Sequence, residues 1–583
     1  MLASTYLALT VRVLIALCTR TFFQPDEYFQ SLEPAHHIVY GYGSLTWEWV
    51  AARPIRSIVY PAINVPIYWF LKNSGLSESG SLGDWLLVAL PKVLHGALAA
   101  CTDIYLGEIA RLVLGGDYVT TALLVSLTSF FHALALSRSL SNSLETSLTT
   151  IAFAFYPWDA SSKLSPQVIF NRPKLRKMIT FSALACMIRA TNAIIWVFLY
   201  LNLLWAVRKH RRIAFSIAAD TITIGMVFLM SMFVLDSLYY GKPTFTPFNF
   251  LKTNLSSVSL FYGANSWHYY LTQAVPILCT TALPFTLHGI WATLASKSSR
   301  NRPLKTILAT VVWTIGIYSL AGHKEWRFLH PVLPLLHLFA AKSLFDLSFK
   351  HSRHVAKERT SDLRMNHSIQ KRFQQRFDLP NIPQTYLFML FLSLPVSLYI
   401  ILFYCSGPVS ILSYFRSIPQ GELRNGTVGF LMPCHSTPGY AYLHREELSL
   451  GRMWSLGCEP PLEGQNLSTY KDQTNVFFDS PEEYLQIYFP GKVNPTFPAS
   501  PLPASIPGAP AALSILSKSS ERLMHPWIHE WPRYLAFFGD LLHEEGVQPL
   551  LERRGYKEVW KAGREWEGEE KRKGGARVWK WSP

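Results

Sequence analysis

Two adjacent acidic residues, Asp26 and Glu27, follow a proline just after the first apolar segment of the chain. A carboxylate there would stand at the boundary between membrane and water, within reach of an attacking hydroxyl group. Transfer of a sugar from a lipid phosphate needs such a base, because a sugar hydroxyl is a poor nucleophile until its proton is being removed. Capping of a helix N-terminus is the structural alternative for the same pair. The sequence leaves both interpretations open.

Basic side chains that could stabilise a departing phosphate occur in several short polar motifs. A phosphate leaving group needs no acid, but cationic donors must balance its charge as the glycosidic bond breaks. Interfacial Arg and Lys residues also anchor membrane helices, so each candidate has a structural alternative. The candidates are Arg53 and Arg56 in ARPIRSIVYP, Arg138 in SRSLSNSLET, and His323, Lys324 and Arg327 in GHKEWRFLHP.

Arg189 and Asn192 interrupt the apolar stretch of residues 178–207. This interruption predicts two half-helices that meet within the membrane. An ionisable residue at membrane depth is a functional candidate. The structural alternative is that these side chains satisfy the carbonyl groups that a broken helix leaves open.

Two further motifs could indicate a metal site or a nucleophile. His36 and His37 are adjacent, and neighbouring residues on a helix point in different directions, which favours packing or an acceptor contact over metal binding. In MPCHSTPGY, residues adjacent in sequence rarely form a nucleophile and its base. A turn in which Cys434 pairs with Cys458 is the favoured interpretation if this part faces an oxidising compartment. With no CxxC pair in the chain, we expect no metal site.

The composition indicates that these motifs are positioned by a membrane protein. Of 583 residues 49% are hydrophobic and only 16% charged, with mean hydropathy +0.16, which is too apolar for a typical soluble enzyme. The net charge of +16 lies largely in short loops between apolar segments, so we expect no nucleic-acid partner. The expected spans or partial spans are residues 2–18, 85–106, 118–137, 144–157, 178–207, 213–235, 272–296, 307–321, 328–347 and 385–405.

Basic loops predict the orientation of these spans. Residues 172–177, 208–212, 297–305 and 350–376 are rich in Lys and Arg and should be cytoplasmic, which places the N-terminus in the cytosol. The opposite side then carries residues 19–84, 138–143, 236–271, 322–327 and 406–583. The candidate acids, the GHKEWRFLHP motif and the glycosylation sequons at Asn254, Asn425 and Asn466 all fall on that second side.

Two parts are expected along the chain. Residues 1–405 would form the transmembrane catalytic domain, with residues 19–84 as its first luminal loop. Residues 406–583 alternate short apolar runs with turn residues, which predicts a small luminal α/β domain in which 533–546 are helical. Residues 494–510 are proline-rich and indicate a linker or surface loop. The absence of an internal repeat argues against a transporter, the alternative from another functional class.

The motifs PDEYFQSLE, AHHIVYGYGSLTWEW, RSIVYP, SLSNSLET, IRATN and HKEWRFLHPVLPLL, in this order, resemble the signature of the dolichol-phosphate-mannose-dependent mannosyltransferases of the GT-C superfamily. The resemblance covers most of the chain. Its first-loop motif together with MPCHSTPGY and GCEPP is similar to the members that act on GPI precursors. Sister enzymes that act on dolichol-linked oligosaccharides share HKEWRF and are the alternative.

The resemblance implies a mostly helical, polytopic GT-C protein of about 10–12 transmembrane or partial helices in the endoplasmic reticulum membrane, with a small C-terminal α/β luminal domain. It implies transfer of an α1,2-linked third mannose from dolichol-phosphate-mannose to a GPI precursor glycolipid by an inverting displacement, with no cofactor. Asp26 would be the base and Glu27 the second candidate. The implied substrate-binding residues are His36, His37, Arg53, Arg56, Arg138, Asn142, Glu145, Arg189, His323, Lys324, Glu325 and Arg327.

Overall fold

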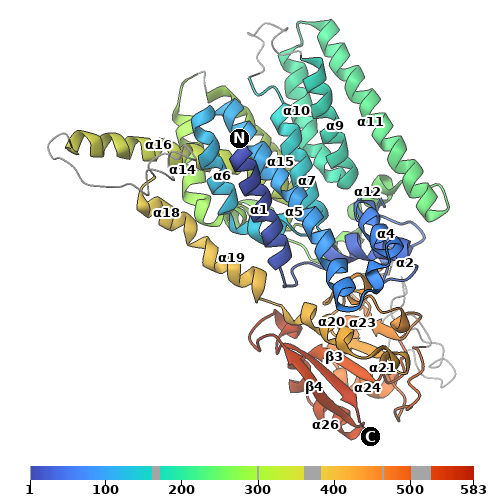
Figure 1. Cartoon of the computed structure of the whole chain (residues 1–583). Coiled ribbons are helices and arrows are strands. Elements are labelled where there is room, and N and C mark those ends of the chain that lie inside the picture. Colours follow the sequence, from blue (N-terminus) through green and yellow to red (C-terminus); the bar gives the residue numbers. More distant parts are fainter. Residues whose placement is uncertain are drawn as a thin grey trace. The chain divides into compact units, whose positions relative to one another are not determined.

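The computed structural model of the chain (Figure 1) describes residues 2–159, 171–298, 301–359, 382–462, 465–500 and 527–582. Its contacts divide the chain into two compact units. We call Met1–Cys18, Lys92–Leu238 and Ala264–Tyr399 the helical unit. We call Thr19–Pro91, Tyr239–Gly263 and Ile400–Pro583 the mixed unit.

Long apolar helices make up the helical unit and confirm a multi-pass membrane protein. Among the residues that the structure describes, five segments are long and apolar enough to span a membrane: Gly80–Val113, Arg211–Tyr240, Tyr270–Ala295, Trp326–Phe349 and Gln384–Ser417. The α-helices that lie wholly or mostly in this unit are α1 (Leu2–Cys18), α5 (Gly80–Val113), α6 (Val119–Leu127), α7 (Ser141–Phe155), α9 (Arg172–Ile188), α10 (Ala193–Ala206), α11 (Arg211–Tyr240), α13 (Val275–Cys279), α14 (Leu283–Ala295), α15 (Arg302–Ser319), α16 (Leu333–Arg359), α18 (Gln384–Phe391) and α19 (Ser393–Leu402).

The predicted interruption at Arg189 and Asn192 is confirmed. Helix α9 ends at Ile188, a short 3-10 turn covers Ala190–Asn192, and α10 starts at Ala193. Arg189 itself is extended, with φ −144° and ψ 113°. The chain therefore leaves the helical path where the polar residues stand, as expected of two half-helices.

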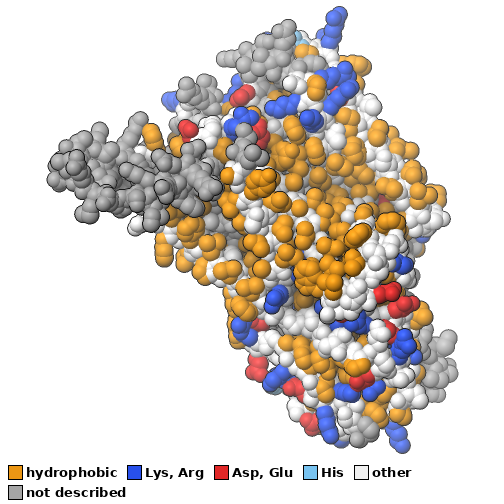
Figure 2. All heavy atoms as spheres, viewed as in Figure 1, with side chains coloured by type: hydrophobic (Ala, Val, Ile, Leu, Met, Phe, Trp, Pro, Cys, Tyr) orange, Lys and Arg blue, Asp and Glu red, His pale blue; other side chains and the backbone are white. Residues whose placement is uncertain are grey.

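The helical unit exposes apolar side chains as a lipid-facing protein does. Figure 2 shows hydrophobic side chains spread over the face that carries α9, α10 and α11, with Lys and Arg gathered at its upper end in that view. On α11, Phe215, Ile222 and Leu238 are exposed, and most of that helix is not covered by protein. A surface of this kind fits the interior of a bilayer.

A buried polar core lies inside the helical unit. Arg12 and Asp103 form a fully buried ion pair, with Nε to Oδ2 at 2.7 Å and Nη2 to Oδ1 at 2.9 Å. Ser126 Oγ donates to the same carboxylate at 2.6 Å and lies 3.0 Å from His132 Nδ1. Burying two ions at membrane depth costs much free energy unless they are well paired. This pairing therefore fixes the positions of α1, α5 and α6 relative to one another.

A five-stranded sheet of order β2-β1-β3-β5-β4 organises the mixed unit. Strand β1 runs parallel to β2 and β3, with Val428 opposite Tyr534, while β5 pairs antiparallel with β3 and β4. The strands are β1 (Val428–Leu431), β2 (Met453–Ser455), β3 (Tyr534–Phe538), β4 (Tyr556–Ala562) and β5 (Ala576–Trp581). The expected fold class, mostly helical with a small C-terminal α/β part, is confirmed.

Both faces of the sheet are covered. One face packs with α20 (Gly407–Ser417) and with first-loop residues such as Tyr28 and Phe29. The other packs with the helices α23 (Gln473–Asp479), α24 (Pro481–Tyr488) and α26 (Val547–Arg553). The remaining helices of this unit are α2 (Glu33–Tyr40), α3 (Trp47–Val50), α4 (Val65–Asn73), α12 (Thr246–Leu255), α21 (Gln420–Arg424) and α22 (Tyr440–Leu443).

The prediction of a helix over 533–546 was wrong. Residues Tyr534–Phe538 form β3, a central strand in which every residue is buried, and only a 3-10 turn follows at Gly539–His543. A strand buried on both faces shows no polar-apolar alternation, so its apolar run cannot be told from a buried helix by periodicity. Of the proline-rich stretch 494–510, residues 501–510 lie outside the described part of the chain.

Candidate active site

Asp26 is at the start of a helical stretch in the mixed unit. The Tyr28 N–H donates to the Pro25 carbonyl oxygen at 3.0 Å, which closes the first turn around the two acids. A π-helical turn, Tyr28–Leu32, follows and leads into α2. Asp26 is partly exposed, whereas Glu27 is buried. The exposed carboxylate is the one that a substrate hydroxyl can reach, and π-helical turns occur frequently at functional sites.

Aromatic contacts fix the turn that carries Asp26. Tyr28 stacks with Phe22 at 5.4 Å between ring centroids and meets Tyr442 edge-on at 5.2 Å. Trp49 Nε1 donates to the Phe29 carbonyl oxygen at 2.9 Å. The candidate base is therefore held by residues from the first loop and from the C-terminal part of the chain, and this limits the entropy lost when a substrate binds.

Glu33 anchors the same helical stretch and was not singled out from the sequence. Its fully buried carboxyl accepts the Ser44 N–H at 2.9 Å and the N–H of Ala441, which is 408 positions away in the sequence. Burial raises the pKa of Glu33 to about 7, although these backbone N–H groups act in the opposite direction. The motif SLEPAHH does not indicate that Glu33 is buried, so the sequence offered no signal that this residue anchors the helical stretch.

His36 is enclosed by aromatic rings and uses both ring nitrogens. Nδ1 lies 3.0 Å from the Tyr42 carbonyl oxygen and Nε2 lies 2.9 Å from His444 Nδ1. Burial lowers the pKa of His36 to about 3 and that of His444 to about 4, so both are neutral near pH 7. His37 is only partly buried. Contact of either first-loop histidine with an acceptor stays a prediction.

The two first-loop arginines differ in their surroundings. Arg53 is exposed. Arg56 donates to Glu48 Oε1 from Nε at 2.9 Å and from Nη2 at 2.6 Å, and Gln30 Nε2 donates to the other oxygen at 3.1 Å. A phosphate would therefore have to compete with Glu48 for Arg56.

In the helical unit, three motifs that are distant in sequence meet around Phe328. Arg189 lies with its guanidinium 5.2 Å from the Phe328 ring centroid, and Arg327 lies 5.8 Å from the same ring. Arg189 Nε is 3.2 Å from Glu145 Oε2, and Asn192 Nδ2 donates to Glu145 Oε1 at 2.9 Å. The structure thus brings SLSNSLET, IRATN and HKEWRF together.

The acidic and basic groups of HKEWRF form a compact ion pair. Arg327 donates to both oxygens of Glu325, from Nε at 2.6 Å and from Nη2 at 2.9 Å, and His323 Nε2 lies 3.2 Å from the same carboxylate. Although burial acts the other way, Arg327 and His323 hold the pKa of Glu325 well below its ordinary value. Lys324 is buried and donates to the Asn265 carbonyl oxygen at 2.7 Å.

Asn142 is a buried polar side chain with no partner among the described residues. Its side-chain oxygen and nitrogen are both buried without a hydrogen bond, and the residue is 1% exposed. Such a group costs about 1–3 kcal/mol when it stays unpaired. A bound hydroxyl or phosphate oxygen would satisfy it. Arg138, from the same motif, is buried and donates from Nε to the Leu134 carbonyl oxygen at 2.7 Å.

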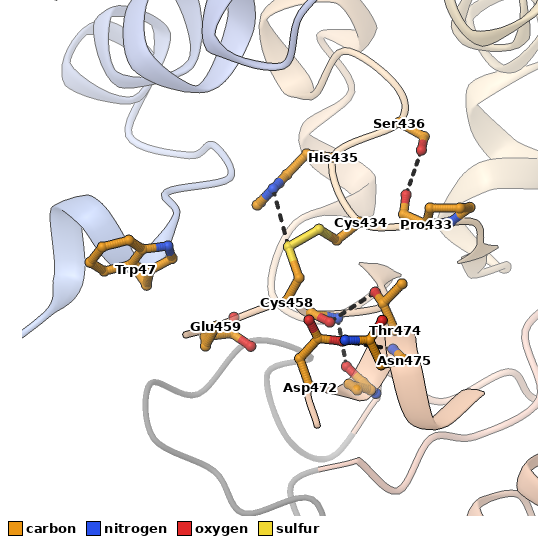
Figure 3. The surroundings of a disulfide bond; sticks show 12 residues. Trp47, Pro433, Cys434, His435, Ser436, Cys458, Glu459, Asp472, Thr474 and Asn475 are labelled. Carbon is orange, nitrogen blue, oxygen red and sulfur yellow. Dashed lines mark hydrogen bonds between the residues drawn. A yellow bond between two sulfur atoms is a disulfide. The ribbon is translucent and has the colours of Figure 1, made fainter. Parts of the chain in front are cut away.

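The structure pairs Cys434 with Cys458 in a disulfide bond of the mixed unit (Figure 3). His435 Nδ1 lies 3.6 Å from Cys458 Sγ. These three residues come close enough to hold a metal ion, but the sulfur atoms are bonded to each other. The sequon residues Asn254, Asn425 and Asn466 are all exposed, and their glycosylation stays a prediction.

Comparison with known proteins identifies relatives over nearly the whole chain. Residues 4–444 match the model of the Alg9-like mannosyltransferase family. GPI mannosyltransferase 3 of Yarrowia lipolytica is 33% identical over 92% of this chain and 93% of its own length. GPI alpha-1,2-mannosyltransferase 3 of Mus musculus is 31% identical over 83% of this chain and 79% of its own length.

Among solved structures, ArnT from Cupriavidus metallidurans, crystallised with undecaprenyl phosphate, has the same fold. The TM-score is 0.56 at 13% identity, over 99% of this chain and 97% of that chain. The apo form of ArnT gives a TM-score of 0.51. At this identity the likeness shows a shared fold.

Proposed function

The chain belongs to the Alg9-like mannosyltransferase family, and from this membership we propose that it transfers mannose from dolichol-phosphate-mannose to the second mannose of a GPI precursor. The product would carry an α1,2-linked third mannose. The observation that carries the choice of acceptor is the similarity to GPI mannosyltransferase 3 of Yarrowia lipolytica over more than nine-tenths of both chains.

Transfer would be one inverting displacement. The acceptor hydroxyl oxygen attacks C1 of the donor mannose, the bond between C1 and the phosphate oxygen breaks, and dolichol phosphate leaves with the electron pair. Asp26 takes the hydroxyl proton as the new bond forms. Because a β-linked donor gives an α-linked product, no covalent sugar-enzyme intermediate is required.

Arg189 and Arg327 are the proposed donors to the phosphate. The charges of Glu145, Arg189, Glu325 and Arg327 sum to zero, so these groups alone do not favour an anion. Lys324 adds the positive charge that balances a phosphodiester. The low dielectric around these buried groups strengthens each interaction with the charge that develops in the transition state.

The endoplasmic reticulum is the proposed location, with the N-terminus cytosolic and the mixed unit luminal. A disulfide bond in that unit supports this side, because disulfides persist in oxidising compartments and are rare in the cytosol. The exposed sequon residues belong to the same unit and fit the same side.

Acceptor choice can be tested with membranes that carry the intact chain at known abundance. The membranes would receive radiolabelled dolichol-phosphate-mannose together with a dimannosyl GPI precursor, or with a dolichol-linked oligosaccharide that lacks an α1,2-mannose. We expect a trimannosyl GPI product that α1,2-mannosidase shortens. Labelling of the dolichol-linked oligosaccharide alone would overturn the GPI assignment and favour the sister activity of the same family.

A further inference from the structure

His435 stands in a backbone conformation that residues with side chains seldom adopt. Its φ is +54°, in the left-handed region. It lies in the turn that follows β1, where the Ser436 hydroxyl donates to the Pro433 carbonyl oxygen at 2.6 Å. Glycine would occupy this conformation without strain, so an imidazole held in it is a candidate for a functional role.

The surrounding structure holds this turn in place on both sides of His435. On one side Cys434 is bonded to Cys458, and the His435 ring is directed toward Cys458 Sγ in Figure 3. On the other side Arg572 Nε donates to Ser436 Oγ at 3.2 Å. Strain persists only where the environment over-determines it, and these contacts meet that condition.

The ring of His435 packs against Phe29, on the helical stretch that begins at Asp26. Its centroid is 4.6 Å from that of Phe29. Phe29 follows Asp26 by three residues on the same helical stretch, so the contact brings the ring within one turn of the candidate base along the chain. The charge of Asp26 acts on the pKa of His435 in the upward direction, which places the two groups within electrostatic reach.

We propose that His435 is a positioning residue for Asp26, in which the imidazole Nε2–H donates to the carboxylate and holds it toward the acceptor hydroxyl. This inference rests on the proposed role of Asp26 as the base. Nδ1 faces a disulfide sulfur, which has no proton to donate. A carboxylate accepts hydrogen bonds only, so it selects the tautomer with the proton on Nε2.

A proton relay through His435 is disfavoured. Burial lowers the pKa of His435 to about 4, despite the opposing effect of Asp26. An imidazole with so low a pKa does not accept a proton from a carboxylic acid near pH 7. Its contribution is therefore orientation of the carboxylate, as in other sites where a hydrogen bond fixes the geometry of a catalytic group.

The test measures mannose transfer by full-length His435→Ala, His435→Gln and the control His543→Ala in membranes, with abundance and the Cys434–Cys458 bond checked by non-reducing electrophoresis. His543 is an exposed histidine of the same unit. His435→Ala should lower kcat about 10- to 100-fold, the loss expected for one hydrogen bond to a charged group, with the KM of both substrates changed less than about threefold. The acid limb of its kcat–pH profile should move to higher pH.

His435→Gln should recover most of kcat, because its amide N–H can replace Nε2–H, and His543→Ala should match the intact chain. A His435→Ala variant with intact kcat and pH profile would overturn the inference. So would failure of His435→Gln to restore kcat while the disulfide and abundance are normal. A double-mutant cycle that combines His435→Ala with Asp26→Glu adds a second criterion. If His435 acts through Asp26, the losses in kcat of the two single variants are strongly non-additive in the double variant, and additive losses would refute the coupling.

Adding Asp26→Asn to this set of variants separates the two proposals. If the Asp26 variants lose transfer and His435→Ala does not, only the positioning role fails. If Asp26→Asn retains transfer, the proposed base fails and any effect of His435 must have another cause.

Discussion

Substitution of Glu33 by Gln should change how the stability of the mixed unit depends on pH. The pKa of this buried carboxyl is raised to about 7 from an ordinary 4.5. The folded-state pKa is about 2.5 pH units above the ordinary value, and each of these corresponds to 1.36 kcal/mol. Above pH 7 the ionisation of Glu33 therefore lowers the free energy of unfolding by about 3 kcal/mol. Because the folded-state pKa is the higher one, stability is fully present below about pH 4.5 and is lost as pH rises to 7.

The assay is thermal unfolding of the detergent-solubilised chain between pH 5 and pH 8, followed by the intrinsic fluorescence of its tryptophans. Glu33→Gln should be less stable than the intact chain at pH 5 by about 1–3 kcal/mol, because an amide cannot accept both the Ser44 and the Ala441 N–H. That deficit should shrink or reverse by pH 8, since Gln does not ionise.

The most deeply buried titratable groups around Glu33 do not mask this effect. His36 and His444 have pKa values lowered to about 3 and about 4, so they stay neutral over the whole range. Tyr440 has its pKa raised by burial, far above pH 8. Parallel stability curves for the two proteins across pH 5–8 would refute the reasoning.

Three further outcomes are expected. Arg189→Ala should lower kcat/KM for the donor by about 100-fold or more. Arg189→Lys should recover only part of that kcat/KM, because Lys lacks the planar fork that binds two phosphate oxygens. Equal kcat/KM of Arg189→Ala and the intact chain would contradict this expectation. Asp103→Asn should destabilise the helical unit by about 3–5 kcal/mol in thermal unfolding, because a buried guanidinium loses its counterion. Gly439→Ala should destabilise the mixed unit, since its Cβ would lie 2.6 Å from the Glu33 carboxyl carbon, whereas Gly421→Ala, with open space, should not.

Much of the helical unit could be predicted from the sequence. Long apolar segments predicted α1, α5 and α11. The polar residues Arg189 and Asn192 predicted the break between α9 and α10. These features are local, so they can be predicted from the composition and spacing of neighbouring residues. The ordered motifs also led to the family, which the match over residues 4–444 confirms.

Other features depend on contacts between distant residues, for which the sequence has no local signal. His36 pairs with His444 across 408 positions, and Glu33 accepts a backbone N–H at an equal separation. The buried strand β3 was mistaken for a helix because both its faces are apolar. The meeting of Glu145, Arg189 and Arg327 around Phe328 likewise requires the folded helices.

The most direct test of the proposed chemistry compares mannose transfer by the intact chain, Asp26→Asn, Glu27→Gln and the control Asp479→Asn, an exposed acid of the same unit, in membranes at matched abundance. If Asp26 is the base, Asp26→Asn should lose about 10²- to 10⁴-fold in kcat with little change in KM, and the control should be fully active. Near-full activity of Asp26→Asn together with loss in Glu27→Gln would contradict the assignment and move the base to the neighbouring acid.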